Sequence, residues 1–273
     1  MKLKPFIAAV SIVSIFSSCS SNLSTAELSP ADSSIEHASI SDVVIEKDSA
    51  EKVDFYPVYS EDSLPLKMLL NDVYSDAELM PLIRKYNWWA LETDSSETNF
   101  NLVKANVKLE RTSEPMGDEK DSSWLQIINT NTMSAIFYVA GSNKIKPHKV
   151  NTVSNSPIRI MPGEKKVINF NNEAYTLKAT GSLDSNQYGI HASNYSLFIE
   201  NAGISTLLSS APYFDDAMIE ILFIGDIDGD GKLDFLIDNS NKYSYREYCL
   251  YLSSYATNGE CVRLVAGKQT MGC

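Results

Sequence analysis

Four aspartates lie close together in the last fifth of the chain, and their spacing suggests a cation site. Asp226, Asp228 and Asp230 alternate, Gly231 follows them, and Asp234 comes four residues after Asp230. Calcium is a hard cation that takes six to eight oxygen ligands, so carboxylates that converge from one loop suit it. The same crowding would make the carboxylates raise one another's pKa values unless positive charge is recruited. The sequence therefore predicts bound Ca²⁺ at this loop.

The loop differs from an EF-hand in two respects. Its aspartates match the first, third and fifth loop positions, and Lys232 would offer its backbone carbonyl at the seventh. Ile237, however, stands where an EF-hand requires glutamate. Apolar segments typical of strands, at residues 218–224 and 233–237, flank the loop in place of helices. Asp234 is expected to bind the ion directly or through water, and Lys232 is the only basic residue within the loop.

Residues 225–238 resemble the Asp-x-Asp-x-Asp-Gly-x-x-Asp hairpin of FG-GAP and VCBS-type repeats, known from integrin propellers and from many exported bacterial proteins. The resemblance implies that Asp226, Asp228, Asp230 and Asp234 are the side-chain ligands of calcium. Propellers repeat this unit in every blade, whereas this chain has one copy. A full β-propeller and integrin-like adhesion are therefore not expected. A structural role for the ion is favoured over a catalytic one, because an oxygen cage leaves little room for substrate.

Sequence signatures of common enzymes are absent. The chain has no G-x-S-x-G, H-E-x-x-H, P-loop or G-x-G-x-x-G motif. Its three histidines, His37, His148 and His191, have no partner at metal-ligand spacing. Carboxylates are plentiful, but their sequence positions alone cannot place two of them across a cleft, so a glycan or peptide hydrolase remains an alternative.

The N-terminus has the pattern of an exported lipoprotein. Lys2 and Lys4 precede an apolar stretch at residues 6–16, which is too short to span a bilayer. The sequence Phe-Ser-Ser-Cys that ends at Cys19 then resembles a bacterial lipobox. Residues 1–18 are accordingly predicted to be a signal peptide and Cys19 the lipidated residue. Serine rather than aspartate follows Cys19, which in Gram-negative lipoproteins implies the outer membrane of the cell envelope.

A serine-rich acidic segment follows the predicted anchor. Residues 19–62 have few large apolar side chains and no glycine, so they offer little surface to bury. They are predicted to be a disordered tether, although residues 39–45 could form a strand or a docking segment. The formal net charge of the whole chain is -12. No basic stripe accompanies this charge, which argues against a nucleic-acid partner.

Residues 63–273 have the pattern of a β-rich globular domain. Ser75 followed by acidic residues predicts a capped helix through about Tyr86, in which Pro81 delays the start or causes a kink. Short alternating or apolar segments occur at residues 102–109, 124–128, 135–139, 167–170, 175–179 and 195–199. Many short strands at this spacing predict an antiparallel β-sandwich or a barrel-like domain with one or two short helices.

Aromatic and cysteine residues of the domain have structural interpretations. Tyr248 and two leucines share one face of a late strand, which favours core packing over an exposed row of rings that could stack on sugars. Cys249, Cys261 and Cys273 lie in a compartment that permits disulfides, and their pairing stays open. The sequence as a whole predicts a membrane-anchored, calcium-stabilised binding module of the cell envelope, with a glycan or a protein as its possible ligand.

Overall fold

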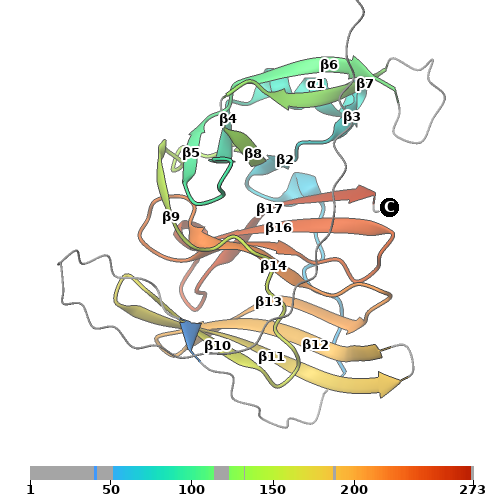
Figure 1. Ribbon diagram of the computed structural model, residues 1–273, viewed down its shortest axis with the longest axis vertical. Helices are drawn as coiled ribbons and strands as arrows, with labels where there is room; N and C mark the ends of the chain where they lie inside the picture. Colours follow the sequence, from blue (N-terminus) through green and yellow to red (C-terminus); the bar gives the residue numbers. More distant parts are fainter. Residues whose placement is uncertain (1–39, 42–51, 114–122, 132, 187–188, 272–273) are drawn as a thin grey trace, which may run out of the picture. The chain divides into compact units, whose positions relative to one another are not determined.

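The structure is a computed structural model, and it describes residues 40–41, 52–113, 123–131, 133–186 and 189–271 (Figure 1). All of them belong to one unit, Ala38–Cys273. The predicted signal peptide, Cys19 and most of the predicted tether lie outside the described residues. Within them, antiparallel strands dominate and are arranged in three sheets, without the repeated blades of a propeller. The prediction of a mainly β, barrel-like domain is therefore confirmed.

A nine-stranded sheet forms the centre of the domain. Its strand order is β17-β16-β15-β14-β9-β5-β4-β8-β2. The strands are β2 (Lys67–Leu69), β4 (Trp88–Thr93), β5 (Phe100–Lys104), β8 (Ser134–Ala140), β9 (His148–Ser154), β14 (Glu220–Asp226), β15 (Asp234–Asp238), β16 (Tyr245–Leu252) and β17 (Arg263–Met271). The two edge strands meet, because the amide of Leu66, just before β2, donates to the carbonyl of Val265 in β17 at 2.9 Å. The sheet is thus nearly closed, and leucine, valine and phenylalanine side chains fill its interior.

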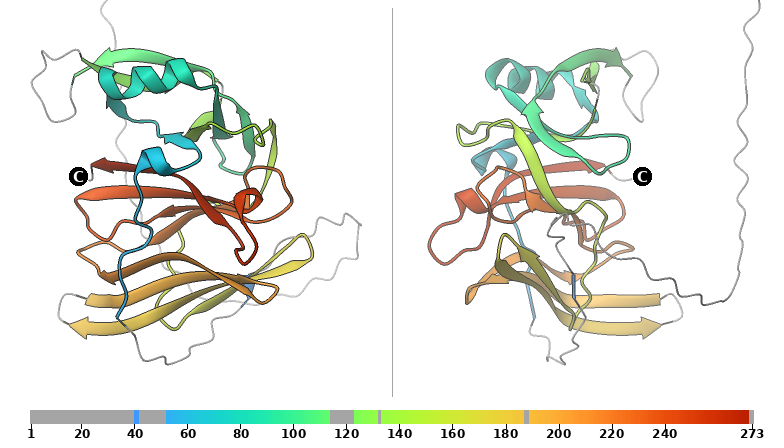
Figure 2. Two further views of the ribbon diagram at one scale, coloured as in Figure 1. Left: turned by 180° about the vertical axis from the view of Figure 1, so that it is seen from behind. Right: turned by 60° about the vertical axis from the view of Figure 1, so that its left-hand side comes forward.

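A five-stranded sheet covers one side of the central sheet, as Figures 1 and 2 show. Its order is β1-β10-β11-β12-β13, and its strands are β1 (Ile40–Ser41), β10 (Lys165–Phe170), β11 (Glu173–Asn186), β12 (Gly189–Asn201) and β13 (Ile204–Tyr213). Leu177, Leu197 and Ile199 of this sheet share a core with Phe235 and Tyr251 of the central sheet. The short strand β1 falls within the segment at residues 39–45 for which a strand was one expectation, and it pairs with β10.

A three-stranded sheet and the helix cover another part of the central sheet. The order is β3-β7-β6, with β3 (Val73–Ser75), β6 (Val107–Thr112) and β7 (Trp124–Asn129). Helix α1 (Asp76–Lys85) begins immediately after Ser75, whose hydroxyl accepts a hydrogen bond from the Glu78 amide. This confirms the predicted cap. The late start considered for this helix is wrong, because the helix runs from Asp76 through Pro81 to Lys85.

One predicted strand is divided between two sheets. Residues 102–109 alternate as if they formed a single strand, but β5 ends at Lys104 and β6 begins at Val107. β5 pairs with β4 and β9, whereas β6 pairs with β7. Between them, the amide of Ala105 still donates to the carbonyl of Trp88. Alternation reports which side of a strand is buried, and it does not reveal that the chain leaves one sheet for another.

The last residues of the segment predicted to be a tether pack on the domain. Tyr56 forms a bridge with Ser210 of β13. The Tyr59 ring occupies the space beside Gly267 of β17, where even a Cβ atom would overlap with it. A short 3-10 helix, η1 (Glu61–Ser63), follows. Aromatic residues provide the apolar surface that the rest of the serine-rich segment lacks, and the folded domain consequently begins before residue 63.

Candidate functional site

The four aspartates of the predicted calcium site are positioned by a β-hairpin. Antiparallel strands β14 and β15 pair Ile224 with Phe235 and place Gly225 opposite Asp234. We call residues 226–234, which connect the two strands at one end of the barrel-like sheet, the aspartate loop. Gly229 and Gly231 have φ angles of 79° and 86°, which glycine adopts without steric cost. The glycines therefore allow the chain to reverse while the aspartates stay on its inner side.

Three of the four predicted ligands come together. Carboxylate oxygens of Asp226, Asp228 and Asp234 all lie within 4.8 Å of one another. The Asp230 carboxylate lies next to this cluster, since the Ser253 hydroxyl is 2.9 Å from its oxygens and 3.0 Å from Asp234 Oδ1. Lys232 is exposed, and its amide donates to Asp230. The donor set is made of hard oxygens, which fits calcium or another hard cation.

Backbone amides hold the carboxylates in place. Asp234, which is fully buried, accepts hydrogen bonds from the amides of Ile227 at 2.7 Å and Asp228 at 3.2 Å. Asp226 accepts from the amides of Gly229 and Gly231, at 2.9 and 3.0 Å. The carboxylates therefore organise the loop from within, and the side chains are oriented before any ion binds.

The electrostatics of the cluster favour a bound positive charge. Burial raises the pKa of Asp234 well above its ordinary value, and the charge of Asp228 raises it further. Burial likewise raises the pKa values of Asp226 and Asp228, to which the charge of Asp230 adds. Ionised carboxylates in this setting are costly unless a cation compensates them. The cluster can meet this cost by binding a proton or a metal ion.

Basic side chains from a distant part of the sequence lie beside the aspartate loop. Lys144 and Lys146, from the connection into β9, and His148, the first residue of β9, line a cavity of about 520 Å³ together with Asp226 and Asp228. His148 Nε2 is 3.4 Å from the backbone carbonyl oxygen of Asp226. Lys232 is thus not the only nearby cation, and the expectation based on the loop alone is corrected. About 80 residues separate the two segments, so no local sequence signal could have revealed the contact.

An apolar side chain closes the barrel-like sheet beneath the aspartate loop. Ile227 lies between two of the acidic residues in sequence, yet it is completely buried and belongs to the interior core with Leu250 and Leu252. The loop therefore encloses its largely buried carboxylates on one side of the backbone and places Ile227 in the core on the other. The only sequence signal for this role is the presence of one isoleucine among the aspartates.

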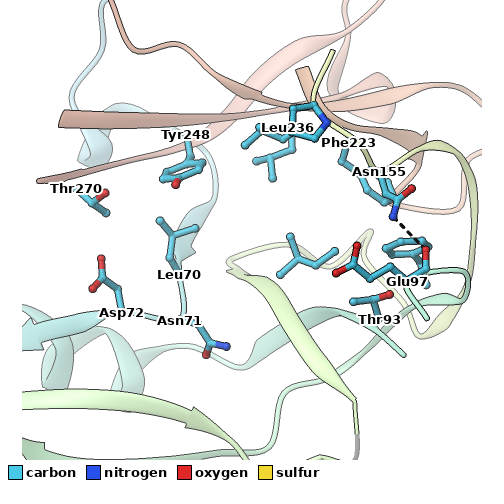
Figure 3. Close-up of a pocket in the computed structure, with 14 residues that line it drawn as sticks. Leu70, Asn71, Asp72, Thr93, Glu97, Asn155, Phe223, Leu236, Tyr248 and Thr270 are labelled. Atoms are coloured by element: carbon cyan, nitrogen blue, oxygen red, sulfur yellow. Dashed lines mark hydrogen bonds between the residues drawn. The ribbon is translucent and has the colours of Figure 1, made fainter. Parts of the chain in front are cut away.

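The opposite end of the barrel-like sheet contains a cavity of about 450 Å³, which we call the open-end cavity (Figure 3). Its inner wall includes Phe100, Phe223 and Leu236, which also belong to the interior core and are at most 3% exposed. Asp72, from the connection between β2 and β3, and Glu97, from the turn between β4 and β5, lie at its edges. Strand ends far apart in sequence thus create one apolar depression with an acidic rim.

Hydrogen bonds fix the polar residues at this rim. The Asn155 amide group donates to the backbone carbonyl of Glu97 at 3.0 Å (Figure 3). Asp94 holds the same turn by accepting from Asn99 and Ser96, and these hydrogen bonds keep the pKa of its carboxyl well below the usual range. Burial raises the pKa of Tyr248, which lines the opposite wall. The rim is therefore a preformed feature of the fold.

The other residues considered in the sequence have structural surroundings. Leu250 and Leu252 are buried as expected for core packing, while Tyr248 is half-buried at the open-end cavity. Within the described residues Cys249 and Cys261 are both free thiols. Cys249 is buried and lies opposite Gly267 in the pairing of β16 with β17. Cys273 and His37 lie outside the described residues.

Comparisons with known proteins complete the description of the site. No protein-family model, curated protein or solved structure matches this chain. In the part of the chain that the structure describes, no helix is long and apolar enough to cross a membrane. Function is accordingly argued from the geometry of the two ends of the barrel-like sheet.

Proposed function

We propose that this protein is a calcium-stabilised binding module of the cell envelope, held at the outer membrane by lipid on Cys19. The observation that carries the calcium assignment is the convergence of Asp226, Asp228 and Asp234 on one point at the end of a hairpin. Calcium fits better than magnesium, which demands near-ideal octahedral geometry and retains several waters. Asp230 and the Lys232 carbonyl belong to the same proposed ligand set.

The ion has a structural role in this proposal. Ile227 seals the core behind the loop, so a substrate cannot enter the barrel-like sheet from this side. Lys144 of the nearby cavity donates to the Ser254 carbonyl and lies over the Tyr255 ring, so its ammonium group is engaged outside the carboxylate cluster. Ca²⁺ would thus neutralise the carboxylates and fasten β14 to β15, while the open-end cavity at the other end receives the ligand.

One observation bears on the alternative of a glycan or peptide hydrolase. Asp72 and Glu97 line the same cavity, as two catalytic carboxylates would. Figure 3 shows them on opposite sides, with apolar side chains between them. Glu97 is exposed in a turn, and Asp72 already accepts a hydrogen bond from the Val73 amide at 2.7 Å. This arrangement supports binding more than general acid–base chemistry.

Thermal melting with and without calcium tests the proposed ion. A ligand present at about one hundred times its Kd stabilises the fold by about 2.7 kcal/mol. In a domain of this size, that free energy raises Tm by roughly 5–10 °C. Asp228→Asn should abolish the calcium response and should leave the chelated protein at least as stable as the chelated wild type, because it removes one crowded charge.

Asp54→Asn provides the matched control, since it removes the same charge from an exposed site outside the loop. This variant should keep the full calcium response. A wild-type Tm that is indifferent to both calcium and chelator would refute the calcium proposal. An equal response to Mg²⁺ at the same concentration would contradict the choice of ion.

Fractionation of cells tests the membrane anchor. The wild-type protein should be found with membranes, and Cys19→Ser should appear in the soluble fraction, because stable attachment depends on the acyl chains. Replacement of Ser20 by alanine leaves the cysteine intact and serves as the control. Unchanged membrane association of Cys19→Ser would disprove lipid anchoring at this residue.

A further inference from the structure

We propose that the open-end cavity binds a small amphipathic amine, a molecule with an apolar body and a cationic amino head. The inference rests on the proposed binding function, and it specifies the ligand class at the same end of the barrel-like sheet. Three properties of the cavity lead to it, namely an apolar interior, an acidic rim with no basic side chain among its described lining residues, and a corner where polar groups converge.

The interior of the cavity suits an apolar body. Leu70 and Leu222 are only half-buried there, and Phe223 and Leu236 form the deeper surface (Figure 3). A volume of about 450 Å³ falls in the range of small-molecule sites. A ligand that covered these side chains would remove apolar surface from water, which favours binding.

The charge at the rim selects the head group. Asp72 and Glu97 both line the cavity, and none of the described lining residues is lysine, arginine or histidine. A carboxylate ligand, such as a fatty acid anion, would be repelled by the Asp72 and Glu97 carboxylates and would find no cation among the described lining residues. A protonated amine instead meets attraction, which a setting less polar than water strengthens. The cavity thus distinguishes between ligands of equal length by the sign of their charge.

The amino head belongs at the corner formed by Asp72, Tyr248 and Thr270. Figure 3 shows these three side chains on the same side of the cavity, next to Leu70. The Tyr248 hydroxyl makes no hydrogen bond within the described part of the chain. Burial raises the pKa of this tyrosine, and the charges of Asp238 and Asp72 raise it further. An ammonium group could donate to the Asp72 carboxylate and to the Thr270 hydroxyl while it lies against the tyrosine ring.

Titration with three ligands of matched chain length tests the inference. Octylamine, octanol and octanoate are added to the calcium-loaded protein, and binding is followed by calorimetry. We expect octylamine to bind about tenfold more tightly than octanol, a ratio that corresponds to 1.4 kcal/mol, and octanoate to bind most weakly. Asp72→Asn should reduce octylamine to the affinity of octanol. Glu97→Gln should have a smaller effect, because this carboxylate is exposed.

Leu222→Trp tests whether the ligands bind in this cavity. The larger side chain fills the cavity and should lower the affinity for all three ligands. The proposal is overturned if octanoate binds as well as octylamine, if Asp72→Asn keeps the preference for the amine, or if no ligand binds at millimolar concentration. A calcium melt of the same sample distinguishes failure of the ligand class from failure of the proposed function. A calcium response without amine binding would reject the ligand class alone, whereas loss of both would reject the proposed function as well.

Discussion

The two ends of the barrel-like sheet differ in what closes them. At one end, Ile227 of the aspartate loop covers the core, and three convergent, largely buried carboxylates lie above it. At the other end, strand termini leave a cavity of about 450 Å³ whose wall is continuous with the core. One end therefore concentrates charge on a sealed surface, and the other exposes apolar surface within an acidic rim.

In the proposed function, this difference separates stability from recognition. A carboxylate cluster gains from an ion only if its geometry is fixed, and the amides that bond to Asp226 and Asp234 provide that rigidity. A ligand cavity needs apolar side chains that water can reach. These side chains contribute less to the stability of the fold than fully buried ones do. With the two features at opposite ends, the stability gained at the sealed end offsets the stability lost at the open end. Four substitutions, from the largest expected effect to the smallest, test this comparison.

Ile227→Ala should have the largest effect on stability. It opens a cavity behind the aspartate loop, and such truncations of buried side chains cost about 2–5 kcal/mol. Urea unfolding in the presence of calcium measures the loss. Leu222→Ala at the open end is the matched control, and it should cost less than about 1 kcal/mol because Leu222 is only half-buried. Equal losses at the two positions would contradict the difference between a sealed and an open end.

Lys268→Ala should destabilise the side of β17 that leads to the open end. The Lys268 side chain is 7% exposed, and its Nζ donates to Glu78 at 2.5 Å and to Glu61 at 3.3 Å. Because both glutamates are partly solvated, we expect a loss of about 1–3 kcal/mol in the free energy of unfolding. Lys242→Ala, a half-buried lysine without these partners, is the comparison. An unchanged unfolding midpoint would show that this ion-pair network contributes nothing.

The same lysine predicts a pH dependence. Burial lowers the pKa of Lys268, but the hydrogen bond to Glu78 and the charge of Glu61 outweigh it, so the pKa lies above its ordinary value of 10.5. A raised pKa means that the folded state holds the proton more tightly than the unfolded chain. The stability from Lys268 is therefore complete below 10.5 and is lost as pH rises through the folded pKa. The difference in stability between wild type and Lys268→Ala should shrink over that alkaline window.

Ser253→Ala should cost about 1 kcal/mol, since it removes one hydroxyl donor from the buried end of the aspartate loop. The Ser253 hydroxyl lies between the carboxylates of Asp230 and Asp234. The Ser253 amide, which donates to Asp234 at 2.7 Å, is unaffected. Urea unfolding with and without calcium measures the change. Ser63→Ala, an exposed serine far along the chain, should leave stability unchanged.

Lys146→Gln should have the smallest effect and should act on calcium affinity. The exposed Lys146 lines the cavity beside Asp226 and Asp228, so its removal relieves repulsion of the cation. We expect affinity to rise about twofold at low ionic strength and the gain to disappear at high salt, because exposed charges are screened. Calcium titration by calorimetry measures both. A gain that persists at high salt would show that Lys146 acts through contact, not through charge.

Local sequence patterns predicted the hairpin and its acidic loop well. β14 and β15 lie where apolar alternation flanks the aspartates, and Ser75 caps α1 as its residue type indicates. These features depend on residues that are close together in the sequence. The boundary of the tether was less predictable, because Tyr56 and Tyr59 are ordered by contacts with β13 and β17, more than 150 residues away.

Short-range spacing is enough to specify the chemistry of the carboxylates, the strands that flank them and the predominance of β structure. The choice of strands that share a sheet, the position of Lys146 and His148 beside the aspartate loop, and the presence of Asp72 and Glu97 at one cavity depend on tertiary structure. In a nearly closed sheet, long-range pairing and core packing decide which strands are neighbours. A cavity at its end is assembled from strand termini whose proximity no local pattern records.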